Sequence, residues 1–177
     1  MKARLAPLPL LLLAACTHTP PTTKGALFTP SPFLQRLEWD TLVNAPAQEE
    51  GRQRKWDSHR VRDFGEAEMT PERHVLRPGF EGVFHLEDAD GNRVECRKED
   101  LKRYMDAVRK DLRKQIEPGA AEPPVEESDD RGSTYGFEIS YKAGNTSGRV
   151  TGTGELTGAG KESAIKVTIR LEEEIRP

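Results

Sequence analysis

The sequence predicts an α+β fold in which an antiparallel sheet packs against one long amphipathic helix. Apolar and polar residues alternate over about 80–97 and again over about 134–172, as in half-buried strands. Between these segments, apolar residues recur every three to four positions over about 98–116, as on one face of a helix. Only 34% of the residues are hydrophobic and 32% are charged, so we expect one small core with loose ends.

The overall composition excludes several classes of protein. The chain has 177 residues and a formal net charge of −3, which argues against a nucleic-acid binder that relies on bulk charge. The two cysteines, Cys16 and Cys96, are too few for a disulfide scaffold or a multi-cysteine zinc site. No run of about 18 apolar residues occurs, so no transmembrane helix is predicted.

The first 15 residues have the pattern of a secretory signal peptide. Lys2 and Arg4 precede an apolar run from Leu5 to Ala15, which has the length of a signal core and is too short to span a bilayer. Residues 16–32 are rich in Thr and Pro, which favours an extended tether. At ~3 Å per residue such a tether would span about 50 Å.

Leu13-Ala14-Ala15-Cys16 resembles the lipobox of bacterial lipoproteins. The resemblance implies cleavage after Ala15, a diacylglycerol on the sulfur of Cys16 and an acyl chain such as palmitate on the new amine. Thr17 stands where inner-membrane lipoproteins of Gram-negative bacteria carry Asp, so the resemblance implies the periplasmic face of the outer membrane. The alternative is an ordinary secretory signal with a chance cysteine, although Leu13 fits its cleavage pattern poorly.

Residues 33–175 are predicted to form a single domain, and its first part is the hardest to interpret. Ser31-Pro32 suits the start of a short helix, but the alternation from Leu37 to Val43 suits a strand equally well. The polar segment Asn44–Arg54 reads as a loop. The spacing of Trp56, Arg60, Val61 and Phe64 predicts a helix up to about Gly65. Whether this part joins the main sheet is left open.

The segment about 80–97 is predicted to be a hairpin. Pairing Leu86 with Val94 and Phe84 with Cys96 matches apolar residues across the strands, and this register requires the three-residue loop 89–91. Gly91 then takes the left-handed position of the loop. We therefore expect Cys96 to be buried opposite Phe84.

The helix over about 98–116 should lie on the sheet with one apolar stripe. Acidic residues in its first turn and basic residues in its last turn complement the helix dipole, and Pro118-Gly119 ends it. The stripe consists of Leu101, Tyr104, Met105, Val108, Leu112 and Ile116. The segment 117–132 that follows is acidic and proline-rich, which predicts a flexible loop or linker.

A three-strand meander is predicted over about 134–172. Tyr135 to Tyr141, Val150 to Leu156 and Ile165 to Leu171 each place every second residue on one face, with turns between them. Glycines in the middle strand leave room for Tyr135 or Phe137 to lie across the sheet. A ligand groove over the same glycines is the weaker alternative.

A basic segment with a tryptophan inside it is the candidate partner contact. In an envelope protein it would suit anionic head groups or an acidic protein, while the alternative is a solvated face with the tryptophan in the core. We predict no nucleic-acid partner. The segment comprises Arg52, Arg54, Lys55, Trp56, Arg60 and Arg62.

Motifs for catalysis, metals and nucleotides are not found. The glycines of 148–161 miss the spacing of phosphate-binding loops, and Asp88–Asn92 lacks the calcium-loop ligands at both ends. Histidine and cysteine spacings match no metal site or nucleophile motif. We therefore predict no cofactor, no metal and no catalytic residue, although carboxylate pairs leave glycan hydrolysis open.

These observations favour a lipid-anchored envelope protein that binds or scaffolds without catalysis. It would contact the membrane through the lipid on Cys16 and an envelope protein through its folded domain. The first alternative is a carrier of a lipid or other apolar ligand, which needs an apolar cavity between the helix and the meander. The second is a cell-envelope enzyme, which needs titratable groups gathered in a cleft.

Overall fold

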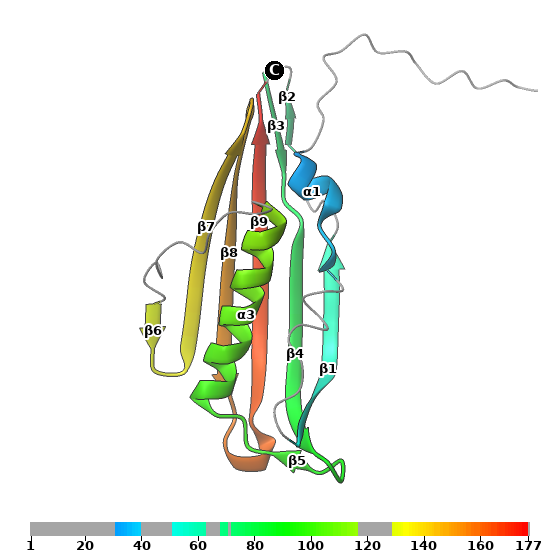
Figure 1. The fold of residues 1–177 in the computed structure, drawn as a ribbon, viewed down its shortest axis with the longest axis vertical. Coiled ribbons are helices and arrows are strands. Elements are labelled where there is room, and N and C mark those ends of the chain that lie inside the picture. Colours follow the sequence, from blue (N-terminus) through cyan, green and yellow to red (C-terminus); the bar gives the residue numbers. More distant parts are fainter. Residues whose placement is uncertain (1–30, 40–50, 63–67, 71, 117–128, 177) are drawn as a thin grey trace, which may run out of the picture.

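The structure is a computed structural model, and it describes residues 31–39, 51–62, 68–70, 72–116 and 129–176. Its strands form one antiparallel sheet in the order β1-β4-β9-β8-β7-β6 (Figure 1). Strand β3 pairs with β9, β2 pairs with β3, and β5 pairs with β4. The predicted signal peptide, Cys16 and almost all of the predicted tether lie outside the described residues.

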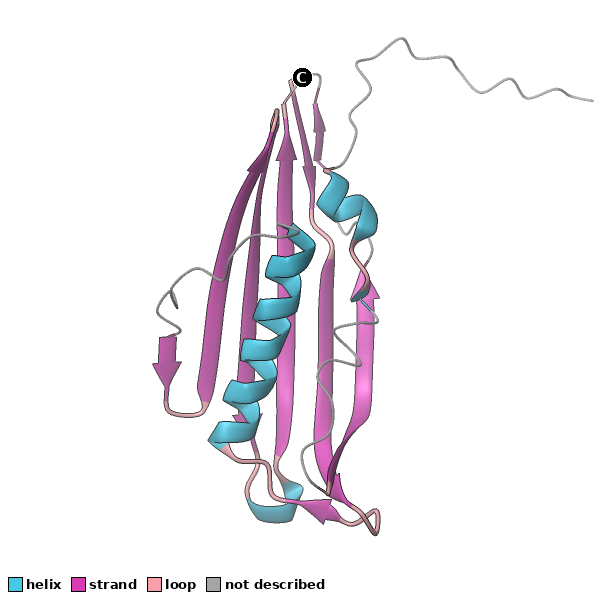
Figure 2. Ribbon diagram, viewed as in Figure 1, coloured by secondary structure: helices cyan, strands magenta, loops and turns pink. Residues whose placement is uncertain are grey.

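The sheet dominates the fold, so the predicted α+β class holds only in its coarser form. The strands are β1 (Arg52–Arg62), β2 (Glu68–Thr70), β3 (Arg73–Leu76), β4 (Gly79–Asp88), β5 (Arg93–Val94), β6 (Asp129–Arg131), β7 (Thr134–Ala143), β8 (Thr146–Thr157) and β9 (Ala164–Ile175). The helices are α1 (Pro32–Arg36), α3 (Lys98–Ile116) and the short 3-10 helix η1 (Gly160–Glu162). Figure 2 shows α1 and α3 on the same side of the sheet.

Helix α3 has the predicted bounds and buries the predicted stripe. Leu101, Tyr104, Met105, Val108 and Leu112 are all buried, and Ile116 packs at the margin of the core. Leu101 and Met105 lie directly over Gly154 of β8, where a Cβ atom would come within 2.4 Å of Leu101 Cδ1. The glycine therefore lets the helix approach the middle of the sheet closely.

The predicted meander is confirmed in its strands, faces and turns. Each of β7, β8 and β9 alternates between buried and more exposed residues, and β8 pairs with both neighbours along its length. Phe137 lies across Gly152 as expected, with its ring within 2.3 Å of where a Cβ would stand. Gly154, in contrast, lies against Leu101 and Met105 of α3 and not against Tyr135.

The predicted hairpin is correct in its register but not in its length. Leu86 pairs with Val94, and Gly91 has a φ of 79° in the loop. The expected pairing of Phe84 with Cys96 is wrong, because β5 ends at Val94 and Phe84 instead pairs with Trp56 and Ile165. Cys96 is nevertheless buried, with 2% exposure.

The prediction for residues 52–62 is wrong, and the rest of the predicted helix, up to Gly65, lies outside the described residues. The residues taken as the end of a loop and as a helix form β1, which pairs with β4 over its whole length. A β-bulge between Trp56 and Ser58 shifts the register by one residue. The bulge breaks the alternation of the strand, so the apolar residues fall at a spacing that imitates a helix.

Two other segments differ from their predictions at the boundaries. Pro32, the last residue of the predicted tether, is the first residue of α1, which confirms the helix start predicted at Ser31-Pro32. The Ser31 hydroxyl caps the helix by accepting from the Leu34 N–H at 3.1 Å. Asp129–Arg131, placed in the acidic loop, pairs with β7 as strand β6. Residues 117–128 of that predicted loop lie outside the described residues.

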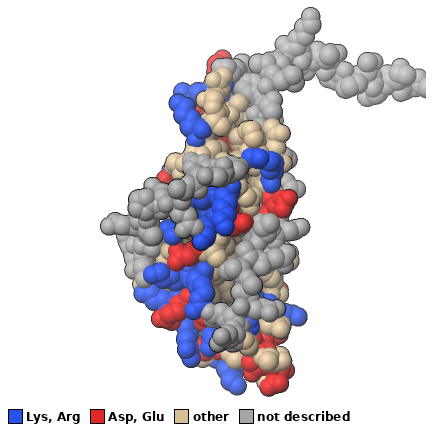
Figure 3. Space-filling model, viewed as in Figure 1, with Lys and Arg blue, Asp and Glu red and all other residues tan. Residues whose placement is uncertain are grey.

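The two faces of the sheet have different environments. The inner face carries α3, α1 and Trp39, with Phe33 packed edge-on against Tyr141 and Trp39 stacked on Phe80. Neither α1 nor α3 covers the other face, which we call the outer face (Figure 1). The inner side of the molecule shows basic and acidic side chains interspersed over its surface (Figure 3).

Candidate functional site

The outer face has a hollow that Gly79 helps to line. Its volume is about 510 Å³, which lies within the range of small-molecule sites. Gly79 of β4 pairs with Arg62 of β1 on one side and with Arg170 of β9 on the other, and Arg170 pairs in turn with Thr151 of β8. This row across the sheet therefore has a glycine floor between two arginines.

Arginines dominate the lining of this hollow, which we call the arginine-lined hollow. Two glutamates, Glu81 and Glu172, accompany them, so the basic groups are in excess. The five arginines come from three strands, β1, β8 and β9, and from the segment between β3 and β4: Arg60, Arg62, Arg77, Arg149 and Arg170.

Among the described residues, ion pairs engage three of these arginines but not the other two. Arg77 Nε lies 3.0 Å from Glu172 Oε2, and Arg62 lies 3.8 Å from Glu81. Arg149 is 4.0 Å from Glu138 of β7, outside the hollow. Within the part of the chain that the structure describes, Arg60 and Arg170 have no ion-pair partner. Both are exposed, so both are accessible to a ligand.

A second, smaller hollow continues along the same face. It encloses about 290 Å³, shares Thr151 and Arg170 with the first, and is otherwise lined by Thr153, Glu155, Lys166 and Thr168. These are the outward residues of β8 and β9. Polar side chains thus extend from the arginine-lined hollow along the centre of the outer face.

The predicted contact segment is divided between the two faces of β1. Arg52, Arg54 and Trp56 lie on the inner side, where Trp56 contacts the rings of Phe80, Phe84 and Tyr104. Beyond the bulge, Arg60 and Arg62 line the arginine-lined hollow on the outer face. Lys55 pairs with His85, also on the outer side. The structure therefore does not gather these six residues into one surface.

Arg54 and Arg52 have local partners on the inner side. The Arg54 guanidinium lies 4.5 Å from the ring centroid of Tyr104 and 5.1 Å from that of Phe84, as in cation–π contacts. Burial lowers the pKa of Arg54. Arg52 forms an ion pair with Asp100 in the first turn of α3, at 3.2 Å. Both arginines therefore connect β1 to α3, and Arg54 also contacts β4.

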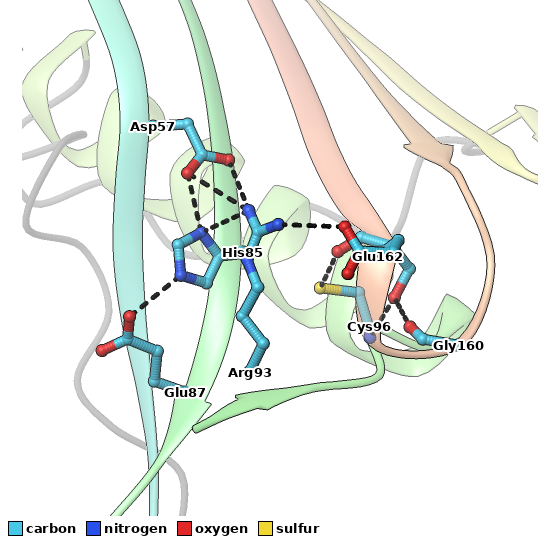
Figure 4. A network of polar contacts seen from close by, with 8 residues as sticks. Asp57, His85, Glu87, Arg93, Cys96, Gly160 and Glu162 are labelled. Atoms are coloured by element: carbon cyan, nitrogen blue, oxygen red, sulfur yellow. Dashed lines mark hydrogen bonds and ion pairs between the residues drawn. The ribbon is translucent and has the colours of Figure 1, made fainter. Parts of the chain in front are cut away.

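A polar cluster surrounds His85, near the C-terminal end of β4 (Figure 4). Its Nε2 lies 3.0 Å from Glu87, and its Nδ1 lies 2.8 Å from Asp57, the residue at the β-bulge. Arg93 contacts Asp57 at 3.2 Å and Glu162 at 3.5 Å. Both ring nitrogens are engaged and the side chain is 9% exposed, so the cluster links β1, β4 and η1 rather than presenting a free base.

Cys96 is held inside the same end of the fold. Its N–H donates to Ser163 Oγ at 2.7 Å, and its sulfur lies 3.6 Å from the Ser163 carbonyl oxygen (Figure 4). Burial raises the pKa of the thiol. A protonated, buried thiol is a poor nucleophile.

A buried carboxylate lies at the opposite end of the inner face. Glu173 of β9 has 0% exposure, and it accepts from the Ser31 N–H at 2.6 Å, the Ser31 hydroxyl at 2.5 Å and the Tyr141 hydroxyl at 2.6 Å. Burial, together with the adjacent carboxylate, raises the pKa of Tyr141. Glu173 thus binds Ser31, the residue at which the predicted tether meets the folded domain.

No protein-family model, curated protein or solved structure matches this chain. Among the residues described, no three His, Cys, Asp or Glu side chains are arranged to hold a metal ion. None of the helices in that part of the chain is both long and apolar enough to cross a membrane.

Sequence reasoning missed Glu173 and three arginines of the hollow. Glu173 continues the inward phase of Leu171 and Ile175, and that phase was a usable signal. Arg77, Arg149 and Arg170 lie far apart in sequence, and only the order of the strands brings them together. The sequence pattern of a single strand cannot predict that these three arginines lie close together.

Proposed function

We propose that this protein is a lipid-anchored protein of the bacterial cell envelope, held at the periplasmic face of the outer membrane, that binds an envelope component without catalysis. The arginine-lined hollow on the outer face is the observation that carries the proposal. Neither α1 nor α3 covers that face, and Arg60 and Arg170 are exposed on it. Both lack an ion pair within the described residues.

The anchor part of the proposal rests on the lipobox-like Leu13-Ala14-Ala15-Cys16 and on Thr17. Two or three acyl chains suffice for stable membrane attachment, because each buried methylene contributes about 0.8 kcal/mol. The contact of Ser31 with Glu173 supports the same arrangement, since it fixes the end of the Thr- and Pro-rich segment to the folded domain.

The packing of α3 favours a binding surface over a carrier of apolar ligands. The carrier alternative needs an apolar cavity between α3 and the meander. Leu101 and Met105 instead lie against Gly154, and Phe137 lies against Gly152, so side chains fill the middle of that interface. The arrangement around His85 likewise gives no support to the enzyme alternative, because both of its nitrogens are engaged.

Fractionation of cells tests the anchor. The wild-type protein should sediment with outer-membrane fractions and gain acyl chains, whereas the Cys16→Ala protein should be uncleaved or soluble. A Cys16→Ala protein that is processed and sedimented like wild type contradicts the anchor.

Site-specific photo-crosslinking in intact cells tests the binding face. A crosslinker at Thr151, which lines the hollow, should give a specific adduct that mass spectrometry can identify. The matched position is Lys102, an exposed residue of α3, which should give none. Adducts only from Lys102, or from neither position, contradict the outer face as the binding surface.

A further inference from the structure

We propose that the arginine-lined hollow binds a soluble small molecule that carries terminal phosphate groups. The inference deepens the proposed function, because it names the ligand class of the same face. It rests on three features of the hollow: the glycine between two arginines, the excess of guanidinium groups and the burial of the apolar residues that border it.

The glycine floor lets two arginines converge on one group. Arg62 and Arg170 lie on either side of Gly79 in one row of paired residues. Neighbouring strands are about 4.8 Å apart, so β1 and β9 are separated by about 10 Å across β4. A guanidinium from each side can therefore reach a single anion above Gly79, where no side chain of β4 intervenes.

The charges of the hollow are complementary to an anion with more than one negative charge. Its five arginines face only two glutamates, and Arg60 and Arg170 have no ion pair within the described residues. Guanidinium groups bind phosphate through two parallel hydrogen bonds. A phosphate also carries more charge and more acceptor oxygens than a carboxylate, so it competes better with Glu81 and Glu172.

The exposed part of the lining favours a charged ligand over an apolar one. Phe80, Ile169 and Leu171 border the hollow, but they are 0%, 1% and 2% exposed because their side chains belong to the inner core. Pro78 also borders the hollow and is buried. The remaining groups are the arginine side chains, carboxylates, a hydroxyl and backbone groups. The recessed floor favours a terminal phosphate that enters end-on over a phosphodiester at a flat bilayer surface.

Calorimetric titration with pyrophosphate tests the inference on the purified full-length protein in a non-ionic detergent. We expect binding that weakens as salt is added. The Arg60→Gln and Arg170→Gln variants should each weaken binding by about tenfold, the usual effect of losing a charged hydrogen-bond partner. The matched control is Arg97→Gln, an exposed arginine outside the hollow, which should bind like wild type.

A gain-of-affinity variant keeps the test independent of folding defects. Glu172→Gln releases Arg77 from its ion pair and removes a repulsive carboxylate, so binding should tighten by roughly threefold. Unchanged or weaker binding by this variant contradicts the assigned site, as does equal loss in Arg97→Gln.

Vesicles separate the two sources of phosphate. Flotation is measured with phosphatidylglycerol vesicles and compared with phosphatidylcholine vesicles. If the hollow does not bind the lipid, the Arg60→Gln and Arg170→Gln proteins should float to the same extent as wild type. No binding of pyrophosphate overturns the inference, and so does vesicle binding that these variants abolish and pyrophosphate does not displace. A Thr151 crosslink to an envelope protein without pyrophosphate binding would leave the proposed function standing while this inference fails.

Discussion

Glu173 is a charged residue in a position that the strand alternation assigns to the core. It lies between Leu171 and Ile175 on the inner face, yet its exposure is 0%. Three donors from Ser31 and Tyr141 satisfy its oxygens, which is the condition under which a carboxylate tolerates burial. The burial of Glu173 therefore requires the hydrogen bonds from Ser31 and Tyr141, and these two residues require Glu173 as their acceptor.

Replacing Glu173 by Gln should lower the free energy of unfolding by about 2–4 kcal/mol. The amide can accept at only one of its two terminal atoms, so at least one donor from Ser31 or Tyr141 loses its acceptor. Urea denaturation measures the change. Glu172→Gln, next in sequence but only partly buried on the outer face, is the control and should cost less than about 1 kcal/mol. Equal effects of the two variants would contradict the structural role of Glu173.

Cys96 should react slowly with a bulky thiol reagent such as a dithiobis-nitrobenzoate while the protein is folded. The thiol is 2% exposed and contacts Ser163, and burial raises its pKa, so the reactive thiolate is scarce at neutral pH. The rate is measured on the Cys16→Ala protein, in which Cys96 is the only thiol, with and without denaturant. A folded rate close to the unfolded rate would contradict the burial.

At the scale of elements, the sequence predicted best where one periodicity runs without interruption. Helix α3 keeps its stripe over its whole length, and β7 to β9 alternate strictly, so each element's face can be identified locally. The prediction for the residues of β1 was wrong because the bulge at Asp57 changes the phase of the alternation. The arginine-lined hollow was out of reach for another reason, since the pairing of β1 with β4 and of β4 with β9 is a property of topology.

The turn between β8 and β9 should be more sensitive to a methyl group than the turn between β7 and β8. Gly158 has a φ of 73° and its Cβ would stand 2.6 Å from the Glu162 carbonyl oxygen, whereas Gly144 has a φ of 59° and open space around it. Gly144→Ala should cost about 1–2 kcal/mol from backbone strain alone, and Gly158→Ala should cost more. Urea denaturation of both variants isolates the steric clash, and equal losses would contradict it.

At the scale of the whole molecule, two buried tyrosines should make the fold sensitive to alkaline pH. Burial raises the pKa of Tyr104 and of Tyr141 above the ordinary value of about 10. The unfolded chain therefore releases these protons at a pH where the folded protein retains them. Their contribution to stability is complete below about pH 10 and is lost above it, by up to about 1.4 kcal/mol per pH unit for each tyrosine.

Urea denaturation at a series of alkaline pH values measures this loss. The Tyr104→Phe protein should show a shallower decline of the unfolding free energy above about pH 10 than wild type, because one of the two protons is gone. Both proteins should respond alike to pH below about 9. An identical alkaline slope in the two proteins would contradict the contribution of Tyr104.

The bond between Ser31 and Glu173 also determines how the domain responds to being pulled. Tension on the chain ahead of Ser31 would first meet the two hydrogen bonds that Ser31 donates to one buried carboxylate. Glu173 is paired with Gly148 of β8 on one side and with Leu76 of β3 on the other, so the load passes to a strand with neighbours on both sides. Such a strand resists by shearing two ladders at once, whereas an edge strand would peel away one hydrogen bond at a time.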